Sequence, residues 1–285
     1  MQLKQAVDAA YEFFLQNDVP SPRLNAELLM MFTLGCDRAY LFAHPERPLT
    51  QQEDSRYQEV IKERGRGCPT QYITGHQEFW GLDLIVTPSV LIPRPETEHV
   101  IETVLELART HYPDGKLRIV DVGTGSGCIA LALATELRCA EIHACDISEE
   151  ALEVARINAA RFGLEQRVLF RPSDLLVAYP GEQFDFVVSN PPYVGESEAD
   201  KVQKQVREFE PKIAVFSGWE GMDIYKRLIP QACAVLKPGG WFVTEIGYSI
   251  EEHVKQRLSG WSEIQTRMDL QGIPRVIAAR KIDKI

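Results

Sequence analysis

The sequence lacks long hydrophobic runs, paired cysteines and an excess of positive charge, and each absence excludes a class of protein. No apolar run approaches the roughly 20 residues that a membrane-spanning helix requires. The start of the chain lacks the apolar core of a signal peptide. The hydrophobic fraction of 45% is ordinary for a soluble globular protein. We therefore expect a cytoplasmic protein that does not contact a membrane.

The six cysteines are scattered along the chain, and no two of them form a CxxC pair. The six histidines are equally dispersed, and none is paired with another at the spacing of metal ligands. Most cysteines have apolar neighbours, which is typical of reduced thiols in a protein core. We expect neither a disulfide framework nor a metal site.

Basic residues are fewer than acidic ones, 31 against 41, so the net charge is −10. Residues 1–92 are acidic as well, with 8 basic and 12 acidic side chains. A protein that grips bare nucleic acid usually neutralises several phosphates with a basic surface. The charge balance therefore favours a protein or small-molecule substrate over a nucleic acid.

Apolar residues recur at helical spacing through residues 1–75, which predicts a small bundle of about four or five short helices. The pattern changes to that of strands in residues 76–94. Two short strands, at residues 82–86 and 90–92, are expected around Thr87-Pro88-Ser89 and form a β-hairpin linker.

Strands alternate with helices from residue 95 onward, beginning with a helix that runs to about residue 110. The expected strands are residues 117–122, 141–145, 168–171, 184–189 and 241–246, and the further helices are residues 128–137, 149–162, 221–236 and 250–258. A last pair of strands, near residues 264–269 and 275–279, resembles an antiparallel hairpin. This alternation predicts an α/β fold with a doubly wound, mostly parallel sheet.

A glycine-rich turn follows the first of these strands and reads Asp121-Val-Gly123-Thr124-Gly125-Ser126-Gly127. Glycines in such a turn let the backbone approach a ligand at the start of a helix. The turn alone is also compatible with an ordinary connection or with a dinucleotide site. However, its spacing is GxGxG, and Asp121 would repel a pyrophosphate but hold a cationic amino-acid group, directly or through water. These details favour a sulfonium-bearing ligand such as S-adenosylmethionine.

Asp146 and Asp174 end the next two strands. Acids in the position of Asp146 hydrogen-bond ribose hydroxyls in nucleoside-binding α/β folds. Asp146 can equally cap the following helix, a role that Ser148 can fill instead. Asp174 is placed to accept a hydrogen bond from adenine N6, and Leu175 to pack on the adenine face. Because these residues and Asn190 follow successive strands, we expect them to line one site.

The strand at residues 184–189 leads into Asn190-Pro191-Pro192-Tyr193, which we call the amide clamp. An amide or aromatic amine nitrogen is a poor nucleophile because its lone pair is delocalised. The Asn190 side-chain carbonyl and the Pro191 backbone carbonyl, held rigid by the successive prolines, can accept its two N–H bonds. Tyr193 offers a flat face for a planar group. The motif alone is also compatible with a plain strand-ending turn.

Taken together, residues 120–127, Asp146, Asp174 and the amide clamp resemble the class I S-adenosylmethionine-dependent methyltransferases that modify exocyclic or amide nitrogens. Further segments are similar to the signatures of the PrmC (HemK) family, the glutamine methyltransferases of peptide chain release factors: residues 69–75, 79–81, 91–98 and 210–214, with Gly218 and Gly221. The resemblance covers nearly the whole chain. One departure is Leu175, where some members carry an aromatic residue, so that adenine stacking there is weaker.

The resemblance implies a helical substrate-binding domain in residues 1–75, a β-hairpin linker in residues 76–94 and a Rossmann-like methyltransferase domain in residues 95–285. S-Adenosylmethionine is the implied cofactor, and S-adenosylhomocysteine is the implied product. The cofactor-binding residues are expected to be Asp121, Gly123, Thr124, Gly125, Ser126, Gly127, Asp146, Asp174, Leu175 and Asn190. The residues expected to bind the substrate are Asn190, Pro191, Pro192 and Tyr193, of which Asn190, Pro191 and Tyr193 are catalytic.

Family members methylate the glutamine of a Gly-Gly-Gln loop in class I release factors, which act in translation termination. We expect the same reaction here, from a monomer that does not bind nucleic acid directly. Three alternatives stay open. They are a glutamine methyltransferase of a ribosomal protein, an adenine-N6 methyltransferase, which would need base flipping and a basic channel, and a non-catalytic module that binds release factors.

Arg94 and Glu96 have two open interpretations. In one, neighbouring prolines stiffen a linker and Glu96 favours the start of a helix. In the other, the segment closes over the cofactor cleft and couples the two domains.

Overall fold

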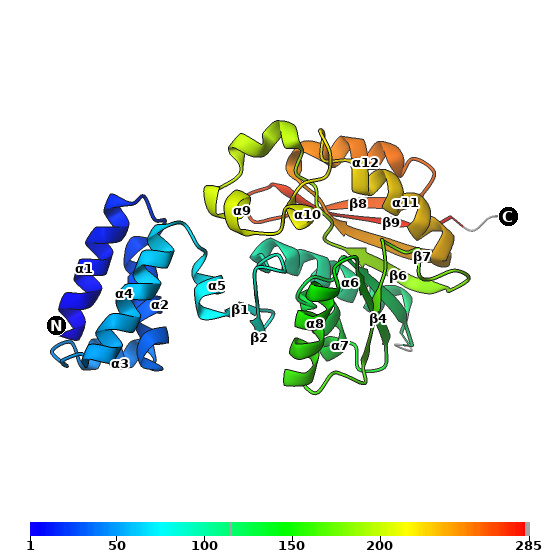
Figure 1. The fold of residues 1–285 in the computed structure, drawn as a ribbon. Helices are drawn as coiled ribbons and strands as arrows, with labels where there is room; N and C mark the ends of the chain where they lie inside the picture. The colour runs from blue at the N-terminus through cyan, green and yellow to red at the C-terminus, as the bar shows by residue number, and fades with distance from the viewer. Residues whose placement is uncertain (114–115, 283–285) are drawn as a thin grey trace. The chain divides into compact units, whose positions relative to one another are not determined.

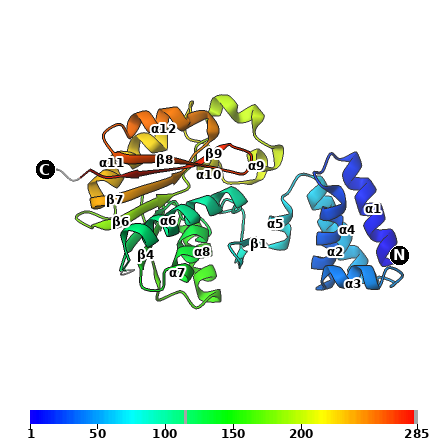
Figure 2. The same cartoon turned by 180° about the vertical axis from the view of Figure 1, so that it is seen from behind.

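The computed structural model of this chain, drawn in Figures 1 and 2, describes residues 1–113 and 116–282. The described residues form two compact units, each with its own buried core. The first unit contains residues 1–76 and the short segment Gln203–Phe209, and the second contains the rest of the described chain. None of the described helices is both long and apolar enough to cross a membrane.

The first unit is helical, as the sequence predicts. Its helices are α1 (Leu3–Gln16), α2 (Pro22–Leu34), α3 (Arg38–Ala43), α4 (Gln51–Gly65), α5 (Thr70–Thr74) and α9 (Lys204–Phe209). Helix α4 begins with a capping box, in which Thr50 and Glu53 satisfy each other's backbone N–H groups. The predicted bundle is confirmed by α1 to α5, whereas α9 was not expected.

A buried arginine holds three segments of the first unit together. Arg64 of α4 is only 4% exposed. Its guanidinium donates to Asn25 Oδ1 at 2.9 Å, to the Cys68 carbonyl at 3.0 Å and to Gln205 Oε1 at 3.2 Å. Because a buried charge is costly unless it is hydrogen-bonded, these contacts fix the segment of α9 to α2 and α4.

The hairpin lies one element earlier than the sequence predicted. Strands β1 (His76–Phe79) and β2 (Leu82–Ile85) form a two-stranded sheet. The strand expected at residues 82–86 is confirmed by β2, but the one expected at residues 90–92 is wrong, since that segment is irregular. The turn is instead Trp80-Gly81, where φ is 53° and 73°. Positive φ at both central residues gives the two-residue turn that matches the twist of the strands.

The second unit is built on a seven-stranded sheet in the order β5-β4-β3-β6-β7-β9-β8. Its strands are β3 (Arg118–Val122), β4 (Glu141–Asp146), β5 (Val168–Pro172), β6 (Phe184–Ser189), β7 (Leu236–Glu245), β8 (Ser262–Met268) and β9 (Pro274–Arg280). Neighbours from β5 to β7 are parallel, and β9 is antiparallel to both β7 and β8. The predicted doubly wound sheet with a terminal hairpin is confirmed. The strand order reverses between β3 and β6, where such sheets bind ligands.

Helices cover both faces of this sheet, as Figure 1 shows. They are α6 (Glu98–His111), α7 (Cys128–Glu136), α8 (Glu149–Arg161), α11 (Asp223–Val235) and α12 (Glu251–Arg257), with the short helices η1 (Pro95–Thr97), η2 (Glu196–Lys201), α10 (Lys212–Val215) and η3 (Tyr248–Ile250) in loops. Val188 of β6 packs in the core with α6, α7 and α8, and Val187 packs in the opposite core with α11 and α12. Central strands are therefore apolar on both faces, which explains why their positions were readable in the sequence.

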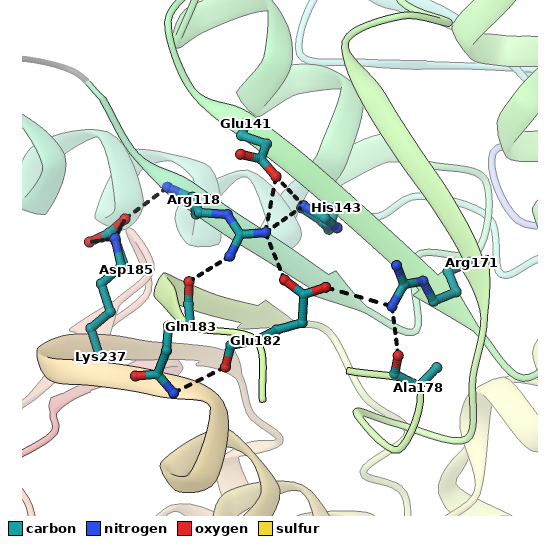
Figure 3. Close-up of polar contacts among 9 residues, drawn as sticks. All are labelled: Arg118, Glu141, His143, Arg171, Ala178, Glu182, Gln183, Asp185 and Lys237. Atoms are coloured by element: carbon teal, nitrogen blue, oxygen red, sulfur yellow. Dashed lines mark hydrogen bonds and ion pairs between the residues drawn. The ribbon is translucent and has the colours of Figure 1, made fainter. Parts of the chain in front are cut away.

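Ion pairs close the amino ends of the central strands (Figure 3). Arg118, at the start of β3, donates to Glu141 at 3.0 Å and to Glu182 at 2.8 Å, and these acids raise the pKa of Arg118. The Arg118 backbone N–H donates to Asp185 of β6 at 2.8 Å, and Lys237 of β7 donates to the same carboxylate at 2.8 Å. Asp185 is only 6% exposed. The polar groups at this edge thus bind one another and have a structural role.

Candidate active site

A cavity of about 560 Å³ lies in the second unit, at the carboxyl ends of β3, β4, β5 and β6. This volume is typical of small-molecule sites. Most of the residues that the sequence proposed for the site line it: Gly123, Thr124, Gly125, Ser126, Asp146, Asp174, Leu175, Asn190, Pro191 and Pro192. Asp121, Gly127 and Tyr193 are not part of this lining. The structure therefore brings the ends of four successive strands to one site.

The glycine turn between β3 and α7 is bound to the neighbouring strand. The N–H groups of Gly123 and Thr124 both donate to the Cys145 carbonyl, at 2.8 and 2.9 Å. Gly123 and Gly125 have φ of 72° and 55°, which is the left-handed region that favours glycine. Gly127 has a packing role in addition, because a Cβ there would lie 3.2 Å from a side chain of α8.

Asp121 lies beneath this turn rather than on the cavity wall. Its side chain is fully buried and accepts a hydrogen bond from Thr124 Oγ1 at 2.7 Å. Burial raises the pKa of Asp121 to about 7. In this conformation Asp121 binds Thr124, which lines the cavity. A contact between Asp121 and a cationic amino-acid group stays a prediction.

Asp146 ties the glycine turn to the end of β4. Its Oδ2 accepts from the Gly125 N–H at 2.9 Å, and its Oδ1 accepts from the Ser148 N–H at 3.0 Å. The Ser148 hydroxyl accepts from the Ala151 N–H at 3.1 Å and so caps α8. The capping role left open for Asp146 therefore belongs to Ser148. Each Asp146 oxygen keeps a second acceptor site for a ligand hydroxyl, and burial raises the pKa of this carboxyl.

Leu175 and Asp174 form the cavity wall after β5. Leu175 has a φ of 55°, a left-handed conformation that costs a residue with a side chain about 1–2 kcal/mol. Such strain is concentrated at functional sites. Asp174 Oδ2 accepts from Arg227 of α11 at 2.5 Å, and both side chains are nearly half exposed. The adenine contacts expected of Asp174 and Leu175 stay predictions.

Three residues of the amide clamp border the cavity, and the fourth is held behind it. The Asn190 side-chain nitrogen donates to Thr97 Oγ1 at 3.0 Å. The Tyr193 hydroxyl donates to Glu245 Oε1 at 3.0 Å. The Tyr193 ring packs against Gly247, where a Cβ would lie 2.9 Å from it. The contact of this ring with a planar substrate group stays a prediction.

Sequence reasoning missed Thr97, Glu245 and Ile147. Thr97 and Glu245 are each 1% exposed. Thr97 lines the cavity beside Asn190, whereas Glu245 is not part of the lining. Ile147 is 56% exposed and lines the cavity beside Asp146. A signal was available for Glu245, because it ends an apolar strand as Asp146 does. Thr97 had no such signal, since its two partners lie 93 and 148 residues away in the sequence.

An ion pair fastens two segments of the cavity rim. The Arg94 guanidinium donates to Glu210, which is only 4% exposed. Pro93 and Pro211, the residues next to this pair, both line the cavity. Of the two interpretations of Arg94, the geometry within the second unit therefore favours a segment that shapes the cleft.

Two family models match the chain. The PrmC N-terminal domain matches residues 5–75, and the methyltransferase small domain matches residues 103–209. Curated relatives named release factor glutamine methyltransferase are similar over nearly the full length. The relative from Koribacter versatilis is 59% identical and covers 99% of this chain and 99% of its own. The relative from Geobacter sulfurreducens is 36% identical, with coverage of 98% and 96%.

Solved structures resemble the fold at low sequence identity. The hMettl16 catalytic domain in complex with MAT2A 3′UTR hairpin 6 has a TM-score of 0.57 and 18% identity, covering 79% of this chain and 83% of its own. A methyltransferase from Pyrococcus furiosus has a TM-score of 0.51 and 19% identity, covering 71% and 90%. These likenesses establish the class I methyltransferase fold alone.

Proposed function

This chain belongs to the PrmC (HemK) family of release factor glutamine methyltransferases, and we propose that it methylates the glutamine of the Gly-Gly-Gln loop in class I release factors. The methyl group comes from S-adenosylmethionine and goes to the side-chain amide nitrogen, which gives N5-methylglutamine. One observation supports this most directly: the amide clamp borders the same cavity as the glycine turn and Asp146. A transfer between a nucleoside cofactor and a planar nitrogen requires that proximity.

The donor set of the cavity fits S-adenosylmethionine. Asp146 has acceptor capacity for the ribose hydroxyls, and Ile147 and Leu175 offer apolar surface for the adenine. The glycine turn leaves room for the amino-acid part to approach the backbone at the start of α7. When bound, the cofactor supplies a methyl group on a sulfonium, which needs no further activation as a leaving group.

The amide clamp has the task of holding the substrate nitrogen in line with that methyl group. Asn190 Oδ1 and the Pro191 carbonyl accept the two amide N–H bonds, which orients the nitrogen and supports the positive charge that develops on it. With the cofactor bound, the nitrogen that Asn190 and Pro191 hold would bond to the methyl carbon as the carbon–sulfur bond breaks, with S-adenosylhomocysteine as the leaving group. The extra proton on nitrogen then passes to water.

We assign recognition of the release factor to the helical first unit, which matches the PrmC N-terminal domain over residues 5–75. The net charge of −10 supports a protein substrate over a nucleic acid. The cytoplasmic location and the monomeric state expected from the sequence belong to the same proposal.

The test is incubation of the protein with purified release factors and labelled S-adenosylmethionine, followed by mass mapping of the modified residue. We expect one methyl group on the glutamine of the Gly-Gly-Gln loop. Methylation of a ribosomal protein or a nucleic acid in place of a release factor, or no methylation of any protein, would overturn the proposal.

The role of Asn190 can be tested separately with Asn190→Ala. We expect kcat to fall by about 10²–10³-fold, because one of two acceptors for the reacting amide is lost, while calorimetry shows nearly unchanged cofactor affinity. Gln183→Ala is the matched control, since it removes an exposed amide from the opposite edge of the same sheet. Wild-type turnover in Asn190→Ala would contradict the role of Asn190 as an acceptor for the substrate amide.

A further inference from the structure

A buried carboxylate contacts the amide clamp from the side away from the cavity. Glu245 is the last residue of β7, the strand that pairs with β6 where the clamp begins. We propose that Glu245 is a positioning residue, which acts through Thr97 to fix the side of the Asn190 amide that faces the substrate. This inference rests on the proposed function, because it assigns a role in the same methyl transfer.

Three hydrogen bonds form an unbroken chain from Glu245 to the clamp. The Thr97 hydroxyl donates to Glu245 Oε2 at 2.6 Å, and the Tyr193 hydroxyl donates to Glu245 Oε1 at 3.0 Å. The Asn190 side-chain nitrogen then donates to Thr97 Oγ1 at 3.0 Å. Thr97 and Glu245 are each 1% exposed, so bulk water does not compete for these bonds. One carboxylate thus holds both ends of the amide clamp.

The direction of each bond follows from the ionised carboxylate at the end of the chain. A carboxylate carries no hydrogen and can only accept, so the hydroxyl hydrogen of Thr97 is committed to Glu245. The Thr97 oxygen is then available only as an acceptor toward Asn190. Asn190 must present its NH₂ group to Thr97, which turns its carbonyl oxygen to the opposite side, toward the substrate. That oxygen is the acceptor the reaction requires.

A neutral amide at position 245 removes this constraint, because it can donate as well as accept. The Thr97 hydroxyl is then free to donate to the Asn190 oxygen, and the Asn190 amide can turn over. Its NH₂ group would then face the NH₂ group of the substrate glutamine. Two donors form no hydrogen bond, so the nitrogen would no longer be held in line.

Protonation of Glu245 has the same effect as this substitution. Burial raises the pKa of Glu245 to about 7; the hydrogen bonds from Thr97 and Tyr193 oppose the shift, Glu96 adds to it, and Arg275 opposes it. The other groups that face it are Tyr225, whose hydroxyl donates to the Glu245 backbone carbonyl, and Cys128. Above neutral pH, the ionised Glu245 therefore fixes the orientation of the Asn190 amide. Below neutral pH, the protonated Glu245 no longer fixes it.

The principal test is Glu245→Gln, measured with release factor and labelled cofactor. We expect kcat to fall by about 100-fold, while cofactor affinity measured by calorimetry changes less than about twofold. Asp185→Asn is the matched control, because it also replaces a buried strand carboxylate by an amide, but at the amino ends of the strands, away from the cavity. It should keep the wild-type kcat at temperatures well below unfolding.

Substitutions of Thr97 give an independent measurement if Glu245→Gln fails to fold. Thr97→Val, which keeps the shape but removes the hydroxyl, should lower kcat as Glu245→Gln does, and Thr97→Ser should restore it. The double variant should be no worse than either single one, because both break one chain of bonds. The wild-type kcat should fall as the pH drops through about 7, and Glu245→Gln should lack this fall.

Full kcat in both Glu245→Gln and Thr97→Val, or additive losses in the double variant, would overturn the positioning role. So would a loss of cofactor affinity as large as the loss of kcat, which would indicate a merely structural role. Failure of the proposed function is distinguishable, since it would show as wild-type protein that does not methylate the Gly-Gly-Gln glutamine. The positioning role would fall with it.

Discussion

Single residues of the site are held in states that would be unfavourable elsewhere in the protein. Leu175 has a left-handed backbone, and Asp121 and Glu245 are fully buried carboxylates whose pKa values burial raises to about 7. Each state costs folding free energy, and each occurs in or behind the cavity wall. Contacts with a ligand in the cavity can offset these costs.

Leu175→Gly tests, at one position, whether a residue that costs folding free energy contributes to ligand binding. Glycine relieves the left-handed strain but adds freedom to the unfolded chain, so the free energy of unfolding should change by less than about 1 kcal/mol. Loss of the leucine side chain should weaken cofactor binding about tenfold or more, since burying such a side chain contributes roughly 1.5–3 kcal/mol. Urea unfolding and calorimetry measure the two effects. A large loss of stability with unchanged cofactor affinity would contradict the role in the cavity.

The residues that could be predicted from the sequence are those whose signal is local. Asp146 and Asn190 end apolar strands, and strand ends meet at one edge of a parallel sheet. Thr97 could not be found in this way, because its partners, Asn190 after β6 and Glu245 in β7, are distant in the sequence. Leu175 was found by its position after Asp174, but its left-handed backbone was not predicted.

At the scale of elements, the carboxyl and amino ends of the central strands have different roles. The carboxyl ends of β3 to β6 line the cavity, while their amino ends bind one another through Arg118 and Asp185 (Figure 3). Function and stability can therefore be changed separately at opposite ends of the same strands.

Asp185→Asn should lower stability without changing catalysis. The variant weakens the hold on the Arg118 backbone N–H and leaves the ammonium group of Lys237 without its counter-charge. We expect the free energy of unfolding to fall by about 2 kcal/mol, measured by urea unfolding. The kcat at 25 °C should stay at the wild-type value. A variant that unfolds normally but turns over slowly would contradict the separation of the two edges.

Regular elements were predictable where their apolar pattern is long, and less so where they are short. The sheet strands and the helices α6, α7 and α8 were expected within a few residues of their observed bounds, except that β7 begins at Leu236, before the expected start at residue 241. The hairpin was misplaced because its turn depends on a left-handed Trp80, which composition does not reveal. Helices α9 and α10 are only 6 and 4 residues long, too short for a helical period to show.

At the scale of the whole molecule, the division into two units does not follow the order of the sequence. The segment Gln203–Phe209 belongs with residues 1–76, and Gln205 accepts a hydrogen bond from Arg64 across a separation of 141 residues. Such a contact has no local sequence signal. It shows that the compact first unit includes chain from the middle of the methyltransferase region.

The buried carboxylates give the folded protein a defined response to pH. The pKa of Glu245 is raised from 4.5 to about 7, so the folded state binds this proton more tightly than the unfolded state does. Its contribution is fully present below about pH 4.5 and is lost as the pH rises through 7. Relative to Glu245→Gln, wild-type stability should fall by up to roughly 3 kcal/mol across this window. Urea unfolding of both proteins at pH 5 and pH 8 measures this change. A free energy of unfolding that rises with pH, relative to Glu245→Gln, would contradict the prediction.

The strand order also bears on the order in which the parts of the site are synthesised. Strand β6 is inserted between β3, which precedes it in the chain, and β7, which follows it. A chain emerging from the ribosome can pair β3, β4 and β5 and complete the glycine turn before β7 has been made. The clamp still lacks its anchor at that stage, because Glu245 is the last residue of β7. The residues of the glycine turn, Asp146 and Asp174 are therefore all synthesised before Glu245, which anchors the clamp.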